Sequence, residues 1–124
     1  MLYNQWVMNN NQVDVMNRLG RAMADSSRSR ILLALMEQPC YPAQLSSELG
    51  LSRTNVSNHL ACLRGCGLVR TEVQGRRTMY SLVDPHLAAA LGQLLQATIS
   101  VDEAKTCENP DCTVLGCCNE GAKL

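Results

Sequence analysis

Residues 42–83 decide the fold of this chain, and they read PAQLSSELGLSRTNVSNHLACLRGCGLVRTEVQGRRTMYSLV. Pro42 suits the first turn of a short helix, and Gly50 suits the position just after its last turn. Ser52 is a good N-cap for a second helix, which the spacing of apolar residues extends over 53–65. Because only three residues separate the two helices, we expect a helix-turn-helix.

The period of the sequence changes after this pair of helices. Residues 68–73 and 78–83 are two β-leaning runs, and the four residues 74–77 separate them. This pattern is typical of a β-hairpin. Its tip carries Arg76 and Arg77, so the sequence predicts an arginine-bearing wing directly after the helix-turn-helix.

Helices are also predicted on both sides of this region. Apolar residues recur every three or four positions over 13–23, and a second helical stretch over 25–36 begins with a capping Asp-Ser pair. A last helix begins at an Asp-Pro pair and covers 84–99. The order helix, helix, helix-turn-helix, hairpin, helix predicts a mainly α chain with a small β-hairpin, that is, a winged helix-turn-helix.

The last predicted helix carries an apolar stripe for which the rest of the chain offers no obvious partner. We therefore expect a homodimer that forms through the terminal helices, although a helix that closes the core of a single chain would show the same pattern. The stripe consists of Leu87, Leu91, Leu94 and Leu95.

The formal net charge of the 124 residues is zero, but the charges are unevenly distributed. Residues 53–77 hold five Arg against one Glu, whereas residues 78–124 hold two Lys against six acidic residues. The positive charge of the predicted helix and hairpin favours binding to DNA phosphates. The acidic block cancels this charge in the net charge of the whole chain. With neither an apolar run of about 20 residues nor a signal-peptide pattern, we expect a cytoplasmic protein.

Short polar side chains gather at the start of the second helix of the helix-turn-helix, where a recognition helix contacts bases. Arg can bind guanine with two donors, Asn can bind adenine, and Ser and Thr can contact bases or phosphates. At the hairpin tip, Arg76 and Arg77 are expected to contact phosphate or the minor groove. The expected partner is double-stranded operator DNA with an imperfect inverted repeat, and the expected helix contacts are Arg53, Thr54, Asn55, Ser57 and Asn58.

Seven cysteines in a reducing compartment indicate metal ligands, redox thiols or core residues rather than disulfides. Cys62 and Cys66 lie four residues apart, so they share one face of the recognition helix, away from its core stripe. Cys40 has no cysteine neighbour and is interpreted as structural. A third thiolate has to come from elsewhere, and the tail offers Cys107, Cys112, Cys117 and Cys118.

Three thiolates around one ion form a soft site, which favours Cd(II), Pb(II), Hg(II), Zn(II) or As(III) over hard cations. Because each thiol loses its proton on binding, metal affinity should rise with pH.

These patterns divide the chain into three parts. We expect a flexible N-terminal arm (1–11), a winged helix-turn-helix DNA-binding and dimerisation domain (12–103) and a Cys-rich metal-binding tail (104–124).

Residues 45–69, LSSELGLSRTNVSNHLACLRGCGLV, resemble the ArsR/SmtB family of metal-sensing transcriptional repressors. The pattern Ser-x-His-Leu-x-x-Leu-Arg-x-x-Gly-Leu-Val carries the resemblance, which is closest to the cadmium- and lead-responsive CmtR branch. That branch implies a homodimer that binds its operator without metal and releases it when a soft ion, Cd(II) or Pb(II), binds. Its ligand pattern maps to Cys62, Cys66 and Cys107, and the further tail cysteines Cys112, Cys117 and Cys118 are additional candidates.

The sequence departs from other branches of that family. Tyr41 and Ala43 occupy the positions where many arsenic and cadmium sensors hold a Cys-x-Cys pair, so that site is absent. Asp84 and His86 match the first half of a zinc site in the last helix, but the second half is missing. Asp84 is better explained as a helix cap.

Two other hypotheses are compatible with the sequence. Cys62 and Cys66, or Cys117 and Cys118, could oxidise in a thiol redox-sensing repressor of the same fold. Alternatively, the protein could sequester metal without binding DNA. We expect no enzyme activity, because the chain holds no Cys-x-x-Cys motif and its two histidines follow no base-nucleophile pattern.

Overall fold

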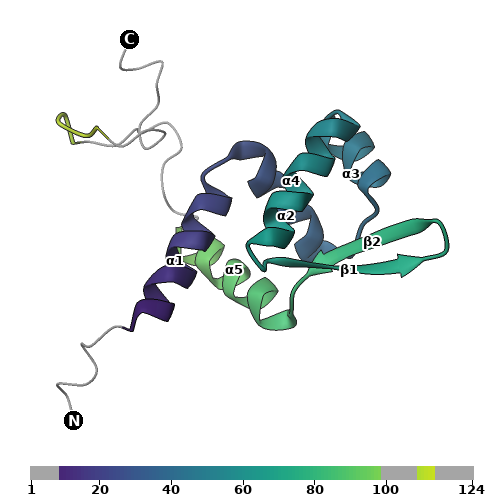
Figure 1. The fold of residues 1–124 in the computed structure, drawn as a ribbon. Coiled ribbons are helices and arrows are strands. Elements are labelled where there is room, and N and C mark those ends of the chain that lie inside the picture. Colours follow the sequence, from purple (N-terminus) through teal and green to yellow (C-terminus); the bar gives the residue numbers. More distant parts are fainter. Residues whose placement is uncertain (1–8, 99–108, 114–124) are drawn as a thin grey trace. The chain divides into compact units, whose positions relative to one another are not determined.

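The structure is a computed structural model that describes residues 9–98 and 109–113. The chain divides into two compact units, Met1–Ala88 and Ala89–Leu124, and α5 crosses the boundary between them. The five helices and the hairpin confirm the predicted winged helix-turn-helix architecture (Figure 1). In chain order the elements are α1 (Asn10–Met23), α2 (Ser26–Glu37), α3 (Pro42–Leu49), α4 (Arg53–Gly65), β1 (Val69–Gln74), β2 (Arg77–Leu82) and α5 (Pro85–Thr98).

Helix α1 begins at Asn10, three residues before the first apolar residue of its predicted stripe, Val13. Asn9 Oδ1 accepts a hydrogen bond from Gln12 N at 2.7 Å, and Gln12 Oε1 accepts one from Asn9 N at 3.4 Å. Together they form a capping box, which satisfies two open donors of the helix start. Because these residues are polar, the apolar period could not reveal the true start of the helix.

The three helix caps that the sequence predicted are present. In each, a side-chain oxygen accepts a hydrogen bond from the backbone N–H three residues on, which satisfies a donor that the helix start leaves open. Gly50, with φ of +67°, ends α3 in the left-handed conformation, as expected. The cap bonds run from Arg28 N to Asp25 Oδ2 (3.0 Å), from Asn55 N to Ser52 Oγ (3.0 Å) and from Leu87 N to Asp84 Oδ1 (3.1 Å).

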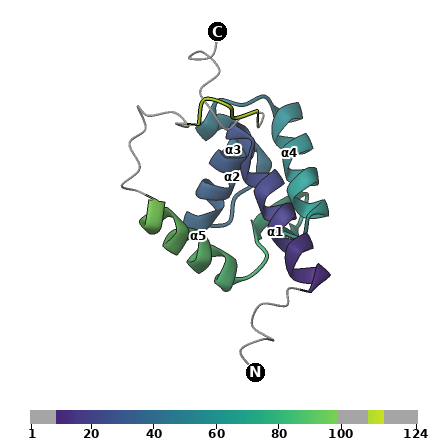
Figure 2. The same cartoon turned by 90° about the vertical axis from the view of Figure 1, so that its left-hand side faces the viewer.

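The core of the first unit is aliphatic and lies where α2, α3 and α4 pack together (Figure 1, Figure 2). Ile31 of α2 and Leu45 of α3 are fully buried, and so are Val56, Leu60 and Leu63 of α4. These three α4 residues form the apolar period from which the sequence predicted this helix. Burial of each such side chain contributes about 1.5–3 kcal/mol, so this cluster fixes the helix-turn-helix without any aromatic residue.

The hairpin is anchored at its base and projects at its tip. At the base, Val69 pairs with Leu82 and both side chains are buried. At the tip, Gln74 pairs with Arg77 and both are exposed. Gly75 follows Gln74 with φ of +66°, a conformation that glycine adopts without strain in a two-residue hairpin turn.

Cys40 joins the hairpin to the segment that precedes α3. Its backbone exchanges two hydrogen bonds with Tyr80 of β2, each 2.9 Å long. Its side chain is 1% exposed, and the thiol donates to Gln38 O at 3.3 Å. Burial raises the pKa of the Cys40 thiol, which makes it a poor ligand and nucleophile. The structure therefore confirms that Cys40 is structural.

The described part of the second unit consists of the α5 residues from Ala89 onward and a short turn over 109–113. In the turn, Cys112 N donates to Asn109 O at 3.2 Å, and Asp111 N donates to Asn109 Oδ1 at 3.0 Å. None of the helices in the described ranges is long and apolar enough to cross a membrane.

Both terminal helices leave large apolar side chains exposed. In α1, Val15 is 47% and Met16 is 70% exposed, and Ala22 is the buried residue of this helix. In α5, Leu94 and Leu95 are 47% and 44% exposed. Apolar side chains that gather on helix surfaces in this way are typical of protein–protein contacts.

Candidate nucleic-acid interface and thiol pair

Helix α4 buries one face and presents the opposite face to solvent. The predicted base contacts lie in its first two turns and are all exposed, as a side chain that reaches a base edge must be. The helix N-terminus adds a positive partial charge that favours phosphate nearby. Base contact by these exposed side chains stays a prediction, and the residues concerned are Arg53, Thr54, Asn55, Ser57 and Asn58.

Hydrogen bonds fix the turn that joins α3 to α4. Leu51 N donates to Ser46 O at 3.2 Å, and Ser46 Oγ donates to Leu51 O. The Arg30 guanidinium reaches across from α2 and donates to Leu49 O. These bonds satisfy carbonyl groups at the end of α3, so the recognition helix starts from a well-ordered turn.

The two predicted wing arginines are exposed but differ in their surroundings. The guanidinium carbon of Arg77 lies 3.5 Å from the centre of the Tyr41 ring, a cation–π contact. The Tyr41 hydroxyl donates to Gln74 Oε1 at 2.7 Å. These contacts could not be predicted from the sequence, because Tyr41 and Arg77 are far apart in the chain and no local pattern links them. Arg76 lies in the turn itself.

His59 faces the start of α2 rather than the DNA-reading face of α4. Its Nε2 lies 3.9 Å from Asp25 Oδ2, and the imidazole is 22% exposed. The backbone N–H of Arg28 holds the pKa of the Asp25 carboxyl below its usual value, with smaller contributions from the charges of Arg28 and His59. This pair belongs to the scaffold that joins α4 to α2.

The two thiols on the recognition helix lie away from the core, as their positions in the helix predicted. Cys62 is exposed and Cys66 is half-buried. Cys66 caps the C-terminus of α4, and its N–H donates to Cys62 O at 3.0 Å, so the two residues stand on successive turns. Two side chains with this spacing can reach one ion, and thiolates suit soft metals.

Of the predicted tail ligands, the described residues include only Cys112. Among residues 9–98 and 109–113, no group of three or more His, Cys, Asp or Glu side chains could hold a metal ion. Cys112 is half-buried in the turn of the second unit. Cys107, Cys117 and Cys118 lie outside the described residues, so the complete ligand set stays a prediction.

A hollow of about 380 Å³ borders Cys66 on the side of α1. Most of its lining is apolar, and Asp84 and His86 lie at its edge. Asp84 caps α5, as interpreted from the sequence, and His86 is 98% exposed, 3.6 Å from the Asp84 carboxylate. The lining consists of Val15, Arg18, Leu19, Cys66, Gly67, Leu68, Val83, Asp84, His86 and Leu87.

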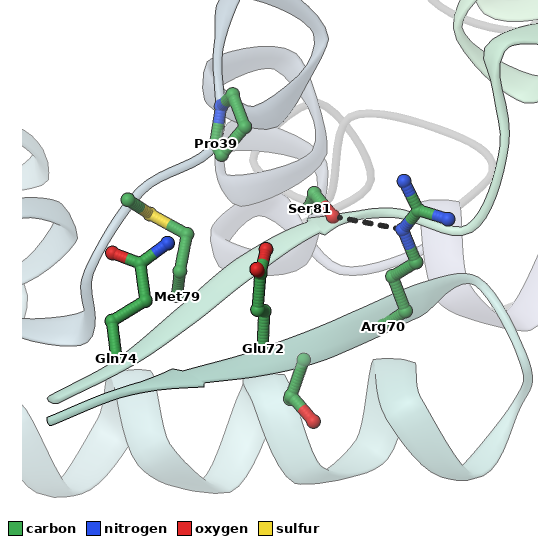
Figure 3. A pocket seen from close by; sticks show the side chains of 7 residues that line it. Pro39, Arg70, Glu72, Gln74, Met79 and Ser81 are labelled. Carbon is green, nitrogen blue, oxygen red and sulfur yellow. Dashed lines mark hydrogen bonds between the residues drawn. The ribbon is translucent and has the colours of Figure 1, made fainter.

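A second hollow of about 490 Å³ lies on the hairpin (Figure 3), and its lining includes none of the residues predicted to bind DNA or metal. Arg70, Glu72 and Gln74 alternate along one face of β1. Arg70 Nε donates to Ser81 Oγ at 3.3 Å, so this cation is held against its own sheet. The lining is open and polar, and it consists of Pro39, Arg70, Thr71, Glu72, Gln74, Met79 and Ser81.

Comparison with known proteins agrees with this arrangement. The family model "Bacterial regulatory protein, arsR family" matches residues 25–71, which run from the cap of α2 into β1. The HTH-type transcriptional regulator CmtR of Mycobacterium tuberculosis is 58% identical over 90 residues, which cover 73% of this chain and 76% of CmtR. A probable mercury resistance operon repressor of Streptomyces lividans is 32% identical over 91 residues, which cover 73% of this chain and 71% of the repressor.

A solved structure shows the same fold. An NMR structure of the cadmium metal-sensor CmtR from Mycobacterium tuberculosis superposes with a TM-score of 0.59 and 57% sequence identity, and it covers 73% of this chain and 95% of CmtR. Sequence, motif and fold thus agree. The chain belongs to the ArsR family of bacterial regulatory proteins, which are DNA-binding transcriptional regulators and not enzymes.

Proposed function

We propose that this protein is a metal-responsive transcriptional repressor whose effector site includes the DNA-reading helix itself. The observation that carries the proposal is the position of two thiols, Cys62 in the C-terminal half of α4 and Cys66 at its C-cap. The predicted base contacts occupy the N-terminal half of the same helix. A ligand held by the thiols therefore acts on the element that contacts DNA. The identity to CmtR, which is called a cadmium metal-sensor, supports a metal as that ligand.

On the DNA side, the chain acts in the cytoplasm as a homodimer that forms through its terminal helices. The exposed apolar side chains of α1 and α5 support this assembly, because a second copy would cover them. A two-fold symmetric dimer presents two recognition helices, so its operator is an imperfect inverted repeat with half-site centres about 10 base pairs apart. Arg76 and Arg77 of each wing contact the flanking backbone or minor groove.

On the metal side, Cys62 and Cys66 supply two thiolates and Cys107 supplies the third. Three thiolates favour Cd(II) or Pb(II), with Hg(II), Zn(II) and As(III) as the other ions that such a site can take. The likeness to a probable mercury resistance operon repressor supports keeping Hg(II) among these ions. Further tail ligands are drawn from Cys112, Cys117 and Cys118.

The same geometry provides a switch. The tail is acidic, and when Cys107 joins the pair on α4 the tail brings negative charge toward the DNA-reading helix. This charge opposes phosphate, and the new contacts can reorient α4. Metal lowers operator affinity only if the free dimer binds the ion more tightly than the DNA-bound dimer does. The two affinities then change by the same factor.

An anaerobic titration tests the proposal. Wild type and the variants Cys62→Ser, Cys66→Ser and Cys107→Ser are titrated with Cd(II) and with Pb(II), and thiolate-to-metal absorption is recorded beside release of operator DNA. We expect each variant to lose absorption and release, and expect Cys40→Ser to respond like wild type because Cys40 is buried. The same substitutions at 112, 117 and 118 identify further ligands.

Three outcomes would overturn parts of this proposal. Full release in Cys107→Ser removes Cys107 from the site. Equal metal affinity with and without operator removes the switch. Release that requires an oxidant and shows no response to anaerobic metal replaces the metal sensor with a thiol redox sensor.

A further inference from the structure

One tyrosine contacts both residues that close the tip of the wing. Gln74 and Arg77 face each other as the last pair of the hairpin ladder. The hydroxyl of Tyr41 donates to Gln74 Oε1 at 2.7 Å, and the Tyr41 ring lies 3.5 Å from the Arg77 guanidinium carbon. Tyr41 itself belongs to the helix-turn-helix, since it is the residue before α3. Its side chain therefore links the helix-turn-helix directly to the tip of the wing.

Tyr41 is itself held in place from both sides along the chain. Its N–H donates to Gln44 Oε1 at 3.3 Å, and its carbonyl accepts from Leu45 N at 3.1 Å in the first turn of α3. The preceding residue, Cys40, exchanges two backbone hydrogen bonds with Tyr80 in the middle of β2. The ring is half-buried. It is thus a fixed platform rather than a mobile surface side chain.

Stacking on the Tyr41 ring restricts the Arg77 side chain and determines which of its groups can contact DNA. An arginine on an exposed hairpin tip samples many rotamers, and ordering it on binding costs conformational entropy. Stacking uses the face of the guanidinium and leaves N–H groups at its edge available for a phosphate. In the part of the chain that the structure describes, Arg77 is the arginine that stacks on a ring, whereas its neighbour Arg76 lies in the turn without such a contact.

We propose that Tyr41 is a positioning residue for DNA binding, which orders Arg77 and holds the wing tip in register with the recognition helix. The inference rests on the DNA-binding role proposed above and adds a residue to it. The stack orders the cation before DNA arrives, and the Gln74 bond keeps the tip from swinging away from α3. The recognition helix and the wing can then contact the same DNA duplex at the same time.

A double-mutant cycle tests this inference with the full chain. The probe is a fluorescent duplex that the wild type selects from a random DNA pool, and its dissociation constant is measured for each variant. Tyr41→Leu, which removes both contacts, should weaken binding about fivefold, the scale of a cation–π contact. Tyr41→Phe keeps the ring and should stay within about twofold of wild type. The difference in DNA affinity between Tyr41→Phe and Tyr41→Leu then measures the contribution of the ring apart from that of the hydroxyl.

The partner substitutions distinguish positioning from a general structural effect. In an Arg77→Ala background, Tyr41→Leu should have almost no further effect, because the group that it orders is gone. In an Arg76→Ala background, the two losses should multiply. Arg77→Lys keeps the charge but loses the planar stack, so it should also become insensitive to Tyr41→Leu. Thermal unfolding of each variant verifies that it is folded.

Each outcome decides between the alternatives. Wild-type affinity in Tyr41→Leu, or an equal loss in both arginine backgrounds, overturns the role of Tyr41 while DNA binding stands. If Tyr41→Leu is unfolded, the stack is tested by Arg77→Lys alone, and wild-type affinity in that variant would overturn the role of the stack. If the wild type selects no duplex at all, the proposed DNA-binding function fails first.

Discussion

The helix-turn-helix and the terminal helix α1 bury their apolar side chains to very different extents. In α2, α3 and α4, the residues Ile31, Leu45 and Leu60 are all 0% exposed. In α1, Val15 is 47% and Met16 is 70% exposed, although the helix has its own capping box and an Asp14–Arg18 ion pair. The first region buries its apolar side chains within one chain, whereas α1 leaves most of its large apolar side chains exposed, as expected if the proposed second copy covers them.

This difference separates two kinds of information in the sequence. An apolar stripe on a helix predicts that the helix buries a face, but it does not state whether the same chain or a second copy covers that face. The stripes of α4 and α1 look alike in the sequence. This chain buries the α4 stripe but leaves Val13 and Met16 of the α1 stripe exposed, so substitutions in the two helices should have different effects on unfolding and on assembly.

The largest expected effect is in the core of the helix-turn-helix. Leu60→Ala removes a fully buried side chain where α4 meets its neighbours, and it should lower the free energy of unfolding by about 2–5 kcal/mol. Val73→Ala, at a position that is 74% exposed near the wing tip, is the control and should change it by less than about 0.5 kcal/mol. Chemical denaturation measures both. Similar values for the two would contradict the packing described here.

The next effect concerns assembly rather than folding. Met16→Glu places a charge on the exposed apolar side of α1, which a second copy is proposed to cover. Burial of an unpaired charge should weaken the dimer roughly 100-fold, about 2.8 kcal/mol, with little change in the unfolding of the single chain. Analytical ultracentrifugation over a concentration series measures the dissociation constant.

A neighbouring substitution provides the matched control for this experiment. Asn17→Glu adds the same charge at an exposed position of the same helix and should leave the dimer intact. A dimer of unchanged affinity in Met16→Glu would exclude the α1 surface from the interface. Loss of the dimer in both variants would point to repulsion by charge alone.

Much of the fold followed from local signals in the sequence. Pro42, Gly50 and Ser52 each act on the backbone within a few residues, so their effects can be predicted without knowledge of the tertiary structure. The apolar period of α4 identified its buried face for the same reason. The start of α1 was missed because a polar capping box, rather than an apolar residue, begins the helix.

The candidate site was predictable only in part. Exposure of Cys62 followed from its position opposite the core stripe, and burial of Cys40 agreed with its lack of a cysteine neighbour. The platform of Tyr41 beneath Arg77 was not predictable, because it depends on how the hairpin folds back against the segment before α3. Contacts between residues far apart in the chain arise from packing, and a single sequence records no period for them.

A smaller effect tests the turn on which the recognition helix depends. Gly50 has φ of +67° and nothing within 4 Å of the place where a Cβ would lie, so Gly50→Ala strains the backbone without a steric clash. The free energy of unfolding should fall by about 1–2 kcal/mol. Gly65→Ala, also in open space but within α4, should raise it by about 0.5–1 kcal/mol. If both substitutions shift stability in the same direction, the left-handed cap is not the cause.

The smallest effect depends on pH and concerns the joint between α1 and α2. Asp25 caps α2, and the Arg28 N–H lowers the pKa of its carboxyl. A lowered folded-state pKa means that the charged cap stabilises the fold above the ordinary aspartate pKa of about 4, and that this contribution is lost as pH falls through the folded-state value. Asp25→Ala should therefore cost about 1 kcal/mol at pH 7 and progressively less below about pH 4.

A second cap shows whether the charge is responsible for this pH dependence. Ser52→Ala removes a hydroxyl cap from α4, which does not titrate, so its cost of about 1 kcal/mol should be the same from pH 7 to pH 3. The Asp25 carboxyl is 39% exposed, and solvent screens its interactions with neighbouring charges, so the cap bond itself should account for most of the difference. Urea denaturation at several pH values measures both costs. An Asp25→Ala cost that is constant over this range would show that the carboxylate charge contributes nothing to the cap.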